Sequence, residues 1–237
     1  MRFTYTFIFL VFFFCKANAQ ADSTTNRILS KTETDEFFND TFKKKYLINF
    51  SIFRAYTYTD KSGTFYVALT ESADAVNKEK DTVNFTIKAL NFKVDKDKTV
   101  TLKKWEINDF RLPSVKGIEQ ETSIWFWTKY CEFKDIDGDG LVDPVIVYGT
   151  FGGNGYDDGR AKIIMFYKGQ KVAIRHQNGI LDSERKTQVD LLFYATPEKI
   201  QQHVKGIMAK MEEKKHAIFP SAYAEKMSKK TTQISNE

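Results

Sequence analysis

Four aspartates crowd one nine-residue stretch of the chain, Asp135-Ile136-Asp137-Gly138-Asp139-Gly140-Leu141-Val142-Asp143, called the acidic loop below. The carboxylates occupy loop positions 1, 3, 5 and 9. The glycine at position 6 permits a sharp turn, and the residue at position 7 can offer its backbone carbonyl. Calcium prefers this chemistry, a set of about six to eight oxygen ligands in a tolerant geometry. We therefore expect a calcium site with the ligands Asp135, Asp137, Asp139, Leu141 and Asp143.

The charge density of the acidic loop supports the same expectation independently of the spacing. Only Lys134 lies close in sequence to balance the four acids. Two like charges about 4 Å apart repel by roughly 1 kcal/mol in water, and by several-fold more where they are partly buried. A bound divalent cation would remove this repulsion. The alternative interpretation is a solvated Asp-Gly hairpin turn that binds nothing.

The acidic loop resembles the calcium loop of EF-hand proteins over its first nine positions. Position 12 is Ile146, where an EF-hand places a bidentate glutamate, and Pro144 with the apolar residues after it predicts a strand. The closer resemblance is to the strand-loop-strand DxDxDG site of integrin-type FG-GAP repeats. Those repeats build propellers from blades of about 40–50 residues, and this chain has one such loop, so the resemblance covers the site and not the fold. The missing ligand at position 12 points to weak affinity, and a site with a dissociation constant of about 10⁻⁴–10⁻³ M would still fill at extracellular calcium levels. The expected role is structural.

Consecutive hairpins are expected to position this loop. Alternating apolar and β-branched residues predict strands over 49–59, 64–70, 83–94, 99–107, 124–133, 142–150, 161–167 and 171–176. A helix is predicted over 32–45, and Thr196-Pro197-Glu198 starts a second helix. Its apolar residues recur at helical spacing and should face the sheet. The pattern predicts an α+β fold, a mainly antiparallel sheet with an N-terminal helix and a C-terminal amphipathic helix packed on it.

The first 19 residues have the pattern of a secretory signal peptide. Arg2 precedes an apolar run over 7–15, and Ala17-Asn18-Ala19 predicts cleavage before Gln20. We expect a flexible leader over 20–31, a single domain over 32–225 and a polar tail over 226–237 that frays. The apolar run is shorter than the roughly 20 residues that span a bilayer, and no later segment is more apolar. The sequence therefore predicts export to the periplasm, cell surface or medium, with no transmembrane segment in the mature chain.

The composition of the mature chain restricts its partners. Cleavage would leave 34 basic against 31 acidic residues, an even balance that argues against nucleic acid as a partner. The mature chain keeps one cysteine, Cys131, and so forms no internal disulfide. It lies in an apolar-rich segment and is interpreted as core.

A second group of residues raises the possibility of an enzyme. The glycine-rich segment 152–160 carries Asp157, Asp158 and Arg160, and His176 follows in a predicted strand. These side chains would support catalysis on a glycan only if they converged in one pocket. Trp125 and Trp127 share one face of a strand, where they either stack on a sugar or belong to the core. No catalytic residue is assigned.

Residues 120–225 resemble a family of uncharacterised exported bacterial proteins that are sometimes labelled surface polysaccharide biosynthesis proteins. The resemblance rests on Trp127-Thr128-Lys129-Tyr130, the acidic loop, 144–149, 154–160, 168–178 and His216-Ala217-Ile218-Phe219-Pro220. It implies a connection with the cell envelope and names no mechanism. Our leading hypothesis is a calcium-stabilised, non-catalytic envelope protein that binds surface polysaccharide or another envelope protein. The alternatives are an envelope enzyme acting on glycan and an inhibitor or accessory subunit of another envelope protein.

Overall fold

The structure is a computed structural model, and it describes residues 24–114 and 121–236. Of these residues, 43% lie in strands and 24% in helices, so the protein is mainly β. The predicted α+β class was wrong, because the strands extend further than expected and the helices only cover the outer faces of the sheets. The predicted signal peptide lies outside the described residues.

A five-stranded antiparallel sheet comes first in the chain, in the order β1-β2-β3-β6-β7. Its strands are β1 (Thr25–Ile28), β2 (Ser51–Asp60), β3 (Gly63–Glu71), β6 (Thr86–Val94) and β7 (Val100–Phe110). A small ribbon of β4 (Ala75–Val76) and β5 (Thr82–Val83) projects from the β3–β6 connection. The predicted hairpin around Asp60-Lys61-Ser62-Gly63 is confirmed by the pairing of β2 with β3.

A seven-stranded antiparallel sheet follows, in the order β14-β13-β12-β11-β10-β8, and β9 also pairs with β10. The strands are β8 (Ser123–Phe126), β9 (Glu132–Lys134), β10 (Asp143–Phe151), β11 (Arg160–Tyr167), β12 (Gln170–Gln177), β13 (Lys186–Val189) and β14 (Gln233–Ser235). The predicted β11–β12 hairpin is confirmed. Its two-residue turn, Lys168-Gly169, has positive φ at both positions, as the tight turn of a twisted hairpin requires.

The N-terminal helical segment is two short helices where one was predicted. Ser30 caps α1 (Lys31–Phe37) through a capping box with Glu33. Asn39 then caps α2 (Asp40–Tyr46), because its side chain accepts a hydrogen bond from the Phe42 N–H. The break turns Phe38 fully into the core. The other helices are α3 (Glu198–Glu213), α4 (Tyr223–Ser228) and the 3₁₀ turns η1 (Thr128–Tyr130), η2 (Tyr156–Asp158), η3 (Asp182–Glu184) and η4 (Leu191–Ala195).

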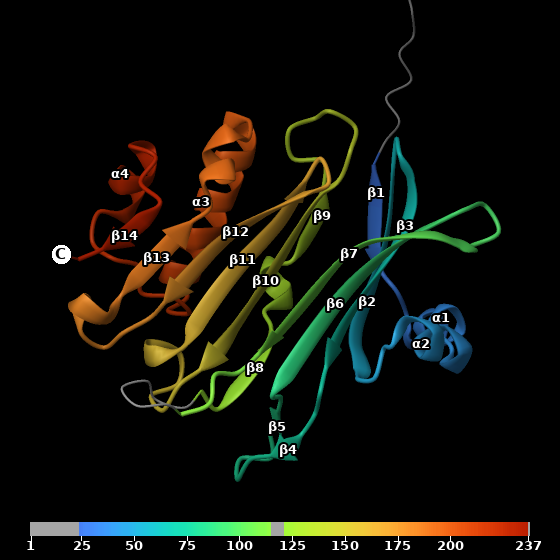
Figure 1. Ribbon diagram of the computed structural model, residues 1–237, viewed down its shortest axis with the longest axis horizontal. Helices are drawn as coiled ribbons and strands as arrows, with labels where there is room; N and C mark the ends of the chain where they lie inside the picture. Colours follow the sequence, from blue (N-terminus) through green and yellow to red (C-terminus); the bar gives the residue numbers. More distant parts are fainter. Residues whose placement is uncertain (1–23, 115–120, 237) are drawn as a thin grey trace, which may run out of the picture.

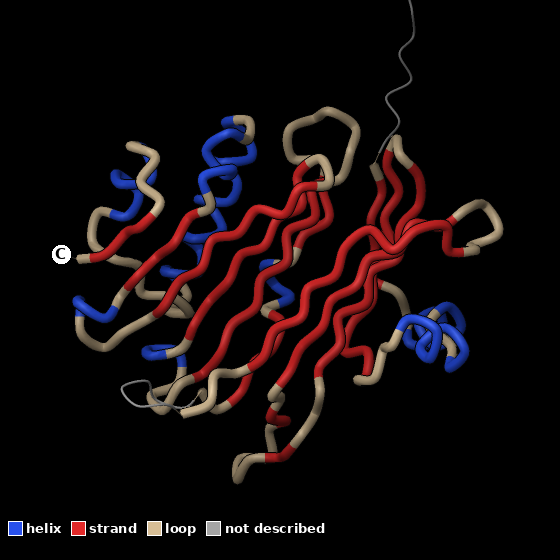
Figure 2. Tube along the Cα trace, in the orientation of Figure 1, coloured by secondary structure: helices blue, strands red, loops and turns tan. Residues whose placement is uncertain are grey.

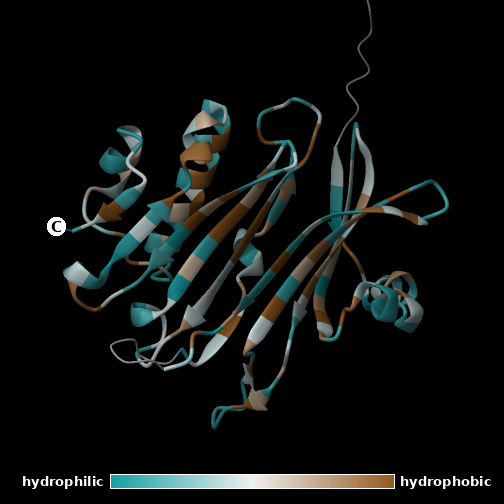
Figure 3. Ribbon diagram, viewed as in Figure 1, coloured by the Kyte–Doolittle hydropathy of each residue, from teal (hydrophilic) through white to brown (hydrophobic). Residues whose placement is uncertain are grey.

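The two sheets pack face to face with helices on both outer sides (Figure 1). Alternation along each strand sends side chains to both faces of its sheet. On β10, Ile146 faces the core between the sheets, whereas Val145 faces the core beneath α3. On β3, Val67 faces the core between the sheets and Ala68 faces the core beneath α1 and α2. The tube view shows the dominance of strands (Figure 2), and hydrophobic residues gather on the central strands and in α3 (Figure 3).

Specific contacts also join the two sheets. Trp105 of β7 stacks on Phe166 of β11, with ring centroids 4.3 Å apart. Asp109 of β7 accepts a 2.9 Å hydrogen bond from the Tyr148 hydroxyl and pairs with Lys162. The sheets are therefore held in register by directional contacts in addition to apolar burial.

Both ends of the predicted domain carry strands that the sequence analysis missed. The expected leader contains β1, which pairs with β2. The expected tail contains β14, which pairs with β13 and buries Ile234. The predictions of a flexible leader and a fraying tail were wrong over these strands, because short polar segments give little periodic signal and gain their structure from the sheet edges. In the described part of the chain, each helix is too short or too polar to cross a lipid bilayer.

Candidate metal centre

The acidic loop connects β9 to β10, at one end of the seven-stranded sheet. Asp143 pairs with Lys134 in the β9–β10 ladder, so the loop starts and ends at adjacent strands. Gly138 and Gly140 have φ values of 87° and 85°, a region that L-residues with side chains rarely adopt. These two glycines let the backbone fold back on itself and bring the first and last aspartates of the loop together.

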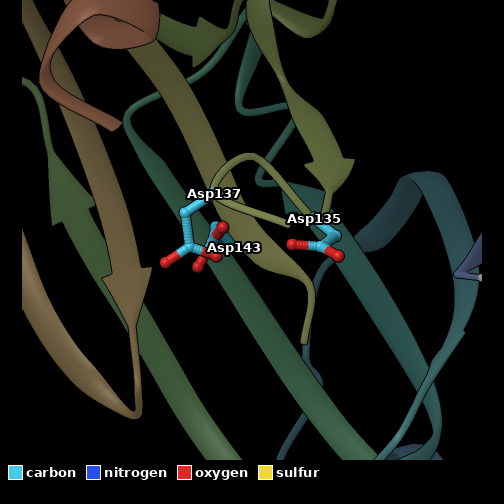
Figure 4. A group of neighbouring side chains, drawn as sticks. All are labelled: Asp135, Asp137 and Asp143. Atoms are coloured by element: carbon cyan, nitrogen blue, oxygen red, sulfur yellow. The ribbon is translucent and has the colours of Figure 1, made fainter. Parts of the chain in front are cut away.

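The structure brings three of the four aspartates to one point. One carboxylate oxygen from each of Asp135, Asp137 and Asp143 lies within 4.8 Å of the other two (Figure 4). Asp143 is only 2% exposed, and the other two are half-buried. A cation among these oxygens would therefore be partly enclosed by protein.

Backbone N–H groups of the loop hold the first and last of these carboxylates in place. Asp135 accepts hydrogen bonds from the Gly138 N–H (2.8 Å) and the Gly140 N–H (2.9 Å). Asp143 accepts a 3.0 Å hydrogen bond from the Ile136 N–H. The loop is thus wrapped around its own carboxylates, an arrangement that fixes their oxygens before any ligand arrives.

The remaining predicted ligands lie beside this group. The Asp139 carboxylate accepts a 2.9 Å hydrogen bond from the Leu141 N–H and lies 3.2 Å from the Lys168 ammonium. Partial burial acts against ionisation of Asp139, but these two contacts hold its pKa below the usual value. Asp139 is not one of the three converging aspartates. Nothing shows the Leu141 carbonyl among them.

The electrostatics of the loop are unfavourable without a cation. The pKa of Asp143 is raised to about 7, chiefly by burial; the hydrogen bond from Ile136 opposes this rise, and the charges of Asp137, Asp139 and Asp135 add to it. An ionised Asp143 is therefore costly in the folded protein. A divalent cation in contact with the three converging carboxylates would offset this cost.

Side chains from three distant elements meet the acidic loop. Lys61 lies in the β2–β3 turn. Its side-chain ammonium donates a 2.8 Å hydrogen bond to the Asp139 carbonyl, and its backbone N–H donates to the Gly140 carbonyl. Lys199 of α3 donates to the Asp137 carbonyl at 3.1 Å. The Tyr167 hydroxyl, at the end of β11, donates to the Asp137 carboxylate at 3.2 Å. The loop thus lies where both sheets and α3 meet, which sequence reasoning missed because these partners are 30 to 78 residues away along the chain.

Three of the four residues considered for catalysis have separate structural partners, and the fourth, Asp157, is exposed. Arg160 forms a bidentate pair with Glu121 and donates to the Phe110 carbonyl at 2.9 Å. Asp158 accepts hydrogen bonds from the backbone and side chain of Asn154, which closes the glycine-rich turn. His176 is buried and lies 2.8 Å from the Thr187 hydroxyl and 2.6 Å from the Asn178 side-chain oxygen. None of these side chains lines the cavity beside α1 and α2 or the smaller one between β1, β2 and β9.

The network around His176 predicts a dependence of stability on pH. Burial lowers the pKa of His176 to about 4, against an ordinary value of 6.5. Below pH 6.5 the His176 imidazole is protonated in the unfolded chain, but in the folded protein it stays neutral until about pH 4. The free energy of unfolding therefore falls by on the order of 3 kcal/mol as the pH falls through this window. Urea unfolding at pH 7 and pH 4.5 should show a larger loss for the wild type than for His176→Gln in the same buffers. Equal losses would contradict this assignment.

The two tryptophans considered for sugar stacking differ in exposure. Trp127 is buried in the core beneath α3, whereas Trp125 is half-buried and packs on it. Trp125 lies against Phe151 and Tyr156, with ring centroids 4.3 and 6.0 Å away. Cys131 is half-buried and packs against the core between the sheets, and burial raises the pKa of its thiol to about 12, so little of it is thiolate near neutral pH.

No family model, curated protein or solved structure matches the chain. The family resemblance described above therefore rests on residue patterns alone.

Proposed function

We propose that the protein is an exported, calcium-stabilised, non-catalytic protein of the cell envelope, and that the acidic loop is its calcium site. The observation that carries the metal part is the convergence of Asp135, Asp137 and Asp143, whose oxygens lie within 4.8 Å of one another around a buried carboxylate. Export is supported by the pattern of residues 1–19. The envelope partner, surface polysaccharide or another protein, is supported by the family resemblance.

The donor set favours calcium over other common metals. All three converging side chains offer hard carboxylate oxygens, and hard oxygen donors suit calcium and magnesium. Zinc and copper sites in proteins are typically built with imidazole or thiolate groups. Magnesium demands a near-ideal octahedral arrangement, whereas calcium accepts the irregular geometry that a loop of carboxylates offers.

The role of the ion would be structural. The loop contacts the β2–β3 turn through Lys61, the end of β11 through Tyr167 and α3 through Lys199. An ion that fixes the loop would therefore strengthen the junction between the two sheets and α3. The enzyme alternative loses support because Arg160, Asp158 and His176 are engaged in separate hydrogen bonds.

Thermal unfolding tests the metal site. Calcium at 10 mM should raise the melting temperature of the full chain over that in chelator by about 5–10 °C, if the dissociation constant is about 10⁻⁴ M. The double variant Asp135→Asn/Asp137→Asn should lose most of this increase, because it removes two of the three converging charges. Magnesium at the same concentration should give a smaller increase.

A matched control removes two acids elsewhere. Asp97 and Asp157 are exposed aspartates outside the acidic loop, and Asp97→Asn/Asp157→Asn makes the same change in net charge. This control should keep the calcium-induced increase. If both double variants respond to calcium as the wild type does, the acidic loop is not the site.

A further inference from the structure

A cavity that is separate from the acidic loop lies on the outer face of the five-stranded sheet, against α1 and α2. It has a volume of about 630 Å³ and opens between α1, α2, β1 and the β6–β7 turn. Small-molecule sites in proteins typically measure about 300–1,000 Å³. The acidic loop contributes no residue to it, so whatever binds here is independent of the metal site.

The floor of this cavity is aromatic and already formed. Phe37 stacks on Tyr66 with ring centroids 3.8 Å apart and planes at 9°. Phe42 and Tyr46 lie 4.6 Å apart, and Tyr46 in turn packs on the fully buried Phe92. Because these rings are fixed by the core behind them, an apolar group could bind against them at little cost in side-chain entropy.

The rim of the cavity carries an excess of positive charge. Arg27 is neutralised by a bidentate pair with Glu33, at 2.9 and 2.6 Å. Lys45 and Lys98 also line the cavity, and among the described residues neither belongs to an ion pair. Glu36 is the other acid of the lining, which leaves the rim with one net positive charge. Cationic ligands, which also favour aromatic faces, are disfavoured by this charge.

From this arrangement we propose that the cavity binds a small amphipathic anion. The apolar or aromatic body of the ligand lies against the half-buried rings of Phe37, Phe42 and Tyr46, and its acidic group lies between Lys45 and Lys98. The rings supply affinity through buried apolar area, and the two ammonium groups orient the ligand.

Two fluorescent probes with one aromatic skeleton separate these contributions. The probe 8-anilinonaphthalene-1-sulfonate carries an anionic group, and N-phenyl-1-naphthylamine lacks it. Titration into the full folded chain should show that the sulfonate binds more tightly. In Lys45→Met/Lys98→Met the sulfonate should bind about tenfold more weakly, the loss expected for two partly exposed charge contacts. Binding of the neutral probe should stay unchanged.

The chain offers a closely matched control. Lys44 and Lys96 lie on the same helix and the same turn as the two rim lysines but do not line the cavity. Lys44→Met/Lys96→Met should therefore bind both probes like the wild type. Thr41→Trp, which places a large ring in the lining, should weaken both probes, and a melting curve for each variant checks that it is folded.

Three results would overturn the proposal. The first is that neither probe binds the folded wild type. The second is that both lysine double variants weaken sulfonate binding equally, which would indicate general attraction to a basic surface. The third is that the neutral probe binds as tightly as the sulfonate, which would remove the anionic group from the recognised chemistry.

Discussion

Asp143→Asn should stabilise the metal-free protein and at the same time reduce its response to calcium. At pH 8 in chelator, the wild type must hold an ionised Asp143 whose folded pKa is about 7 against an ordinary value of 3.8. This difference corresponds to a destabilisation on the order of 4 kcal/mol above pH 7. The cost is absent below pH 3.8, where Asp143 is protonated in both the folded and the unfolded protein. It grows as the pH rises towards 7, because only the unfolded chain then ionises freely. Asparagine removes the charge and can still accept the hydrogen bond from Ile136.

Calcium should narrow the difference in stability between the two proteins. The wild type gains about 2.7 kcal/mol when calcium is 100-fold above its dissociation constant, and the variant gains less because it has lost a charged ligand. Urea unfolding of both proteins, with chelator and with calcium, measures all four free energies. Asp157→Asn serves as the control and should match the wild type in both conditions. A variant that is less stable than the wild type in chelator would contradict the electrostatic argument.

Arg160→Met should cost about 3–5 kcal/mol of stability. The Arg160 and Glu121 side chains are 14% and 6% exposed, and they form a bidentate ion pair. Removal of the guanidinium leaves the Glu121 carboxylate buried without a cation. An uncompensated buried charge destabilises a protein far more than the loss of both partners of the pair. Thr150 and Leu112 would still donate hydrogen bonds to Glu121. Urea unfolding provides the measurement.

Two further variants test the reason for this loss. Glu121→Gln in the Arg160→Met background should recover part of the stability, because the buried charge is then absent. Arg175→Met breaks the more exposed pair with Asp190, which directly follows β13, and in this pair the side chains are 38% and 28% exposed. This control should cost no more than about 1 kcal/mol. If Arg160→Met costs as little as Arg175→Met, Arg160 does not have the structural role described here.

The strands near the centre of each sheet were predictable because apolar and polar residues alternate along them and because turn residues separate one strand from the next. Both β2–β3 and β11–β12 were recognised from such patterns. The fold class was not, because the helices only cover the outer faces of the sheets and because strands such as β1 and β14, whose order comes from pairing with a sheet edge, added to the strand content. The division of the strands into two facing sheets was also invisible, since both faces of β3 and β10 are apolar and alternation alone does not say which face meets which partner.

The acidic loop was predictable as a local feature, and its surroundings were not. The spacing of Asp135, Asp137 and Asp143 anticipated their convergence. The position of Asp139 beside Lys168 depends on a turn 29 residues later in the chain, and a local motif carries no information about such a partner. The same limit applied to Arg160, whose neighbours in sequence suggested a polar site and whose partner, Glu121, lies 39 residues earlier.

A crystal structure of the full chain grown in 10 mM calcium tests the metal site most directly. We expect an anomalous density peak between the carboxylates of Asp135, Asp137 and Asp143, at about 2.3–2.6 Å from their oxygens. Those side chains should keep the positions described here, because loop N–H groups already hold the first and last of them. Density for water alone among these carboxylates, at a calcium concentration that far exceeds the expected dissociation constant, would contradict this expectation.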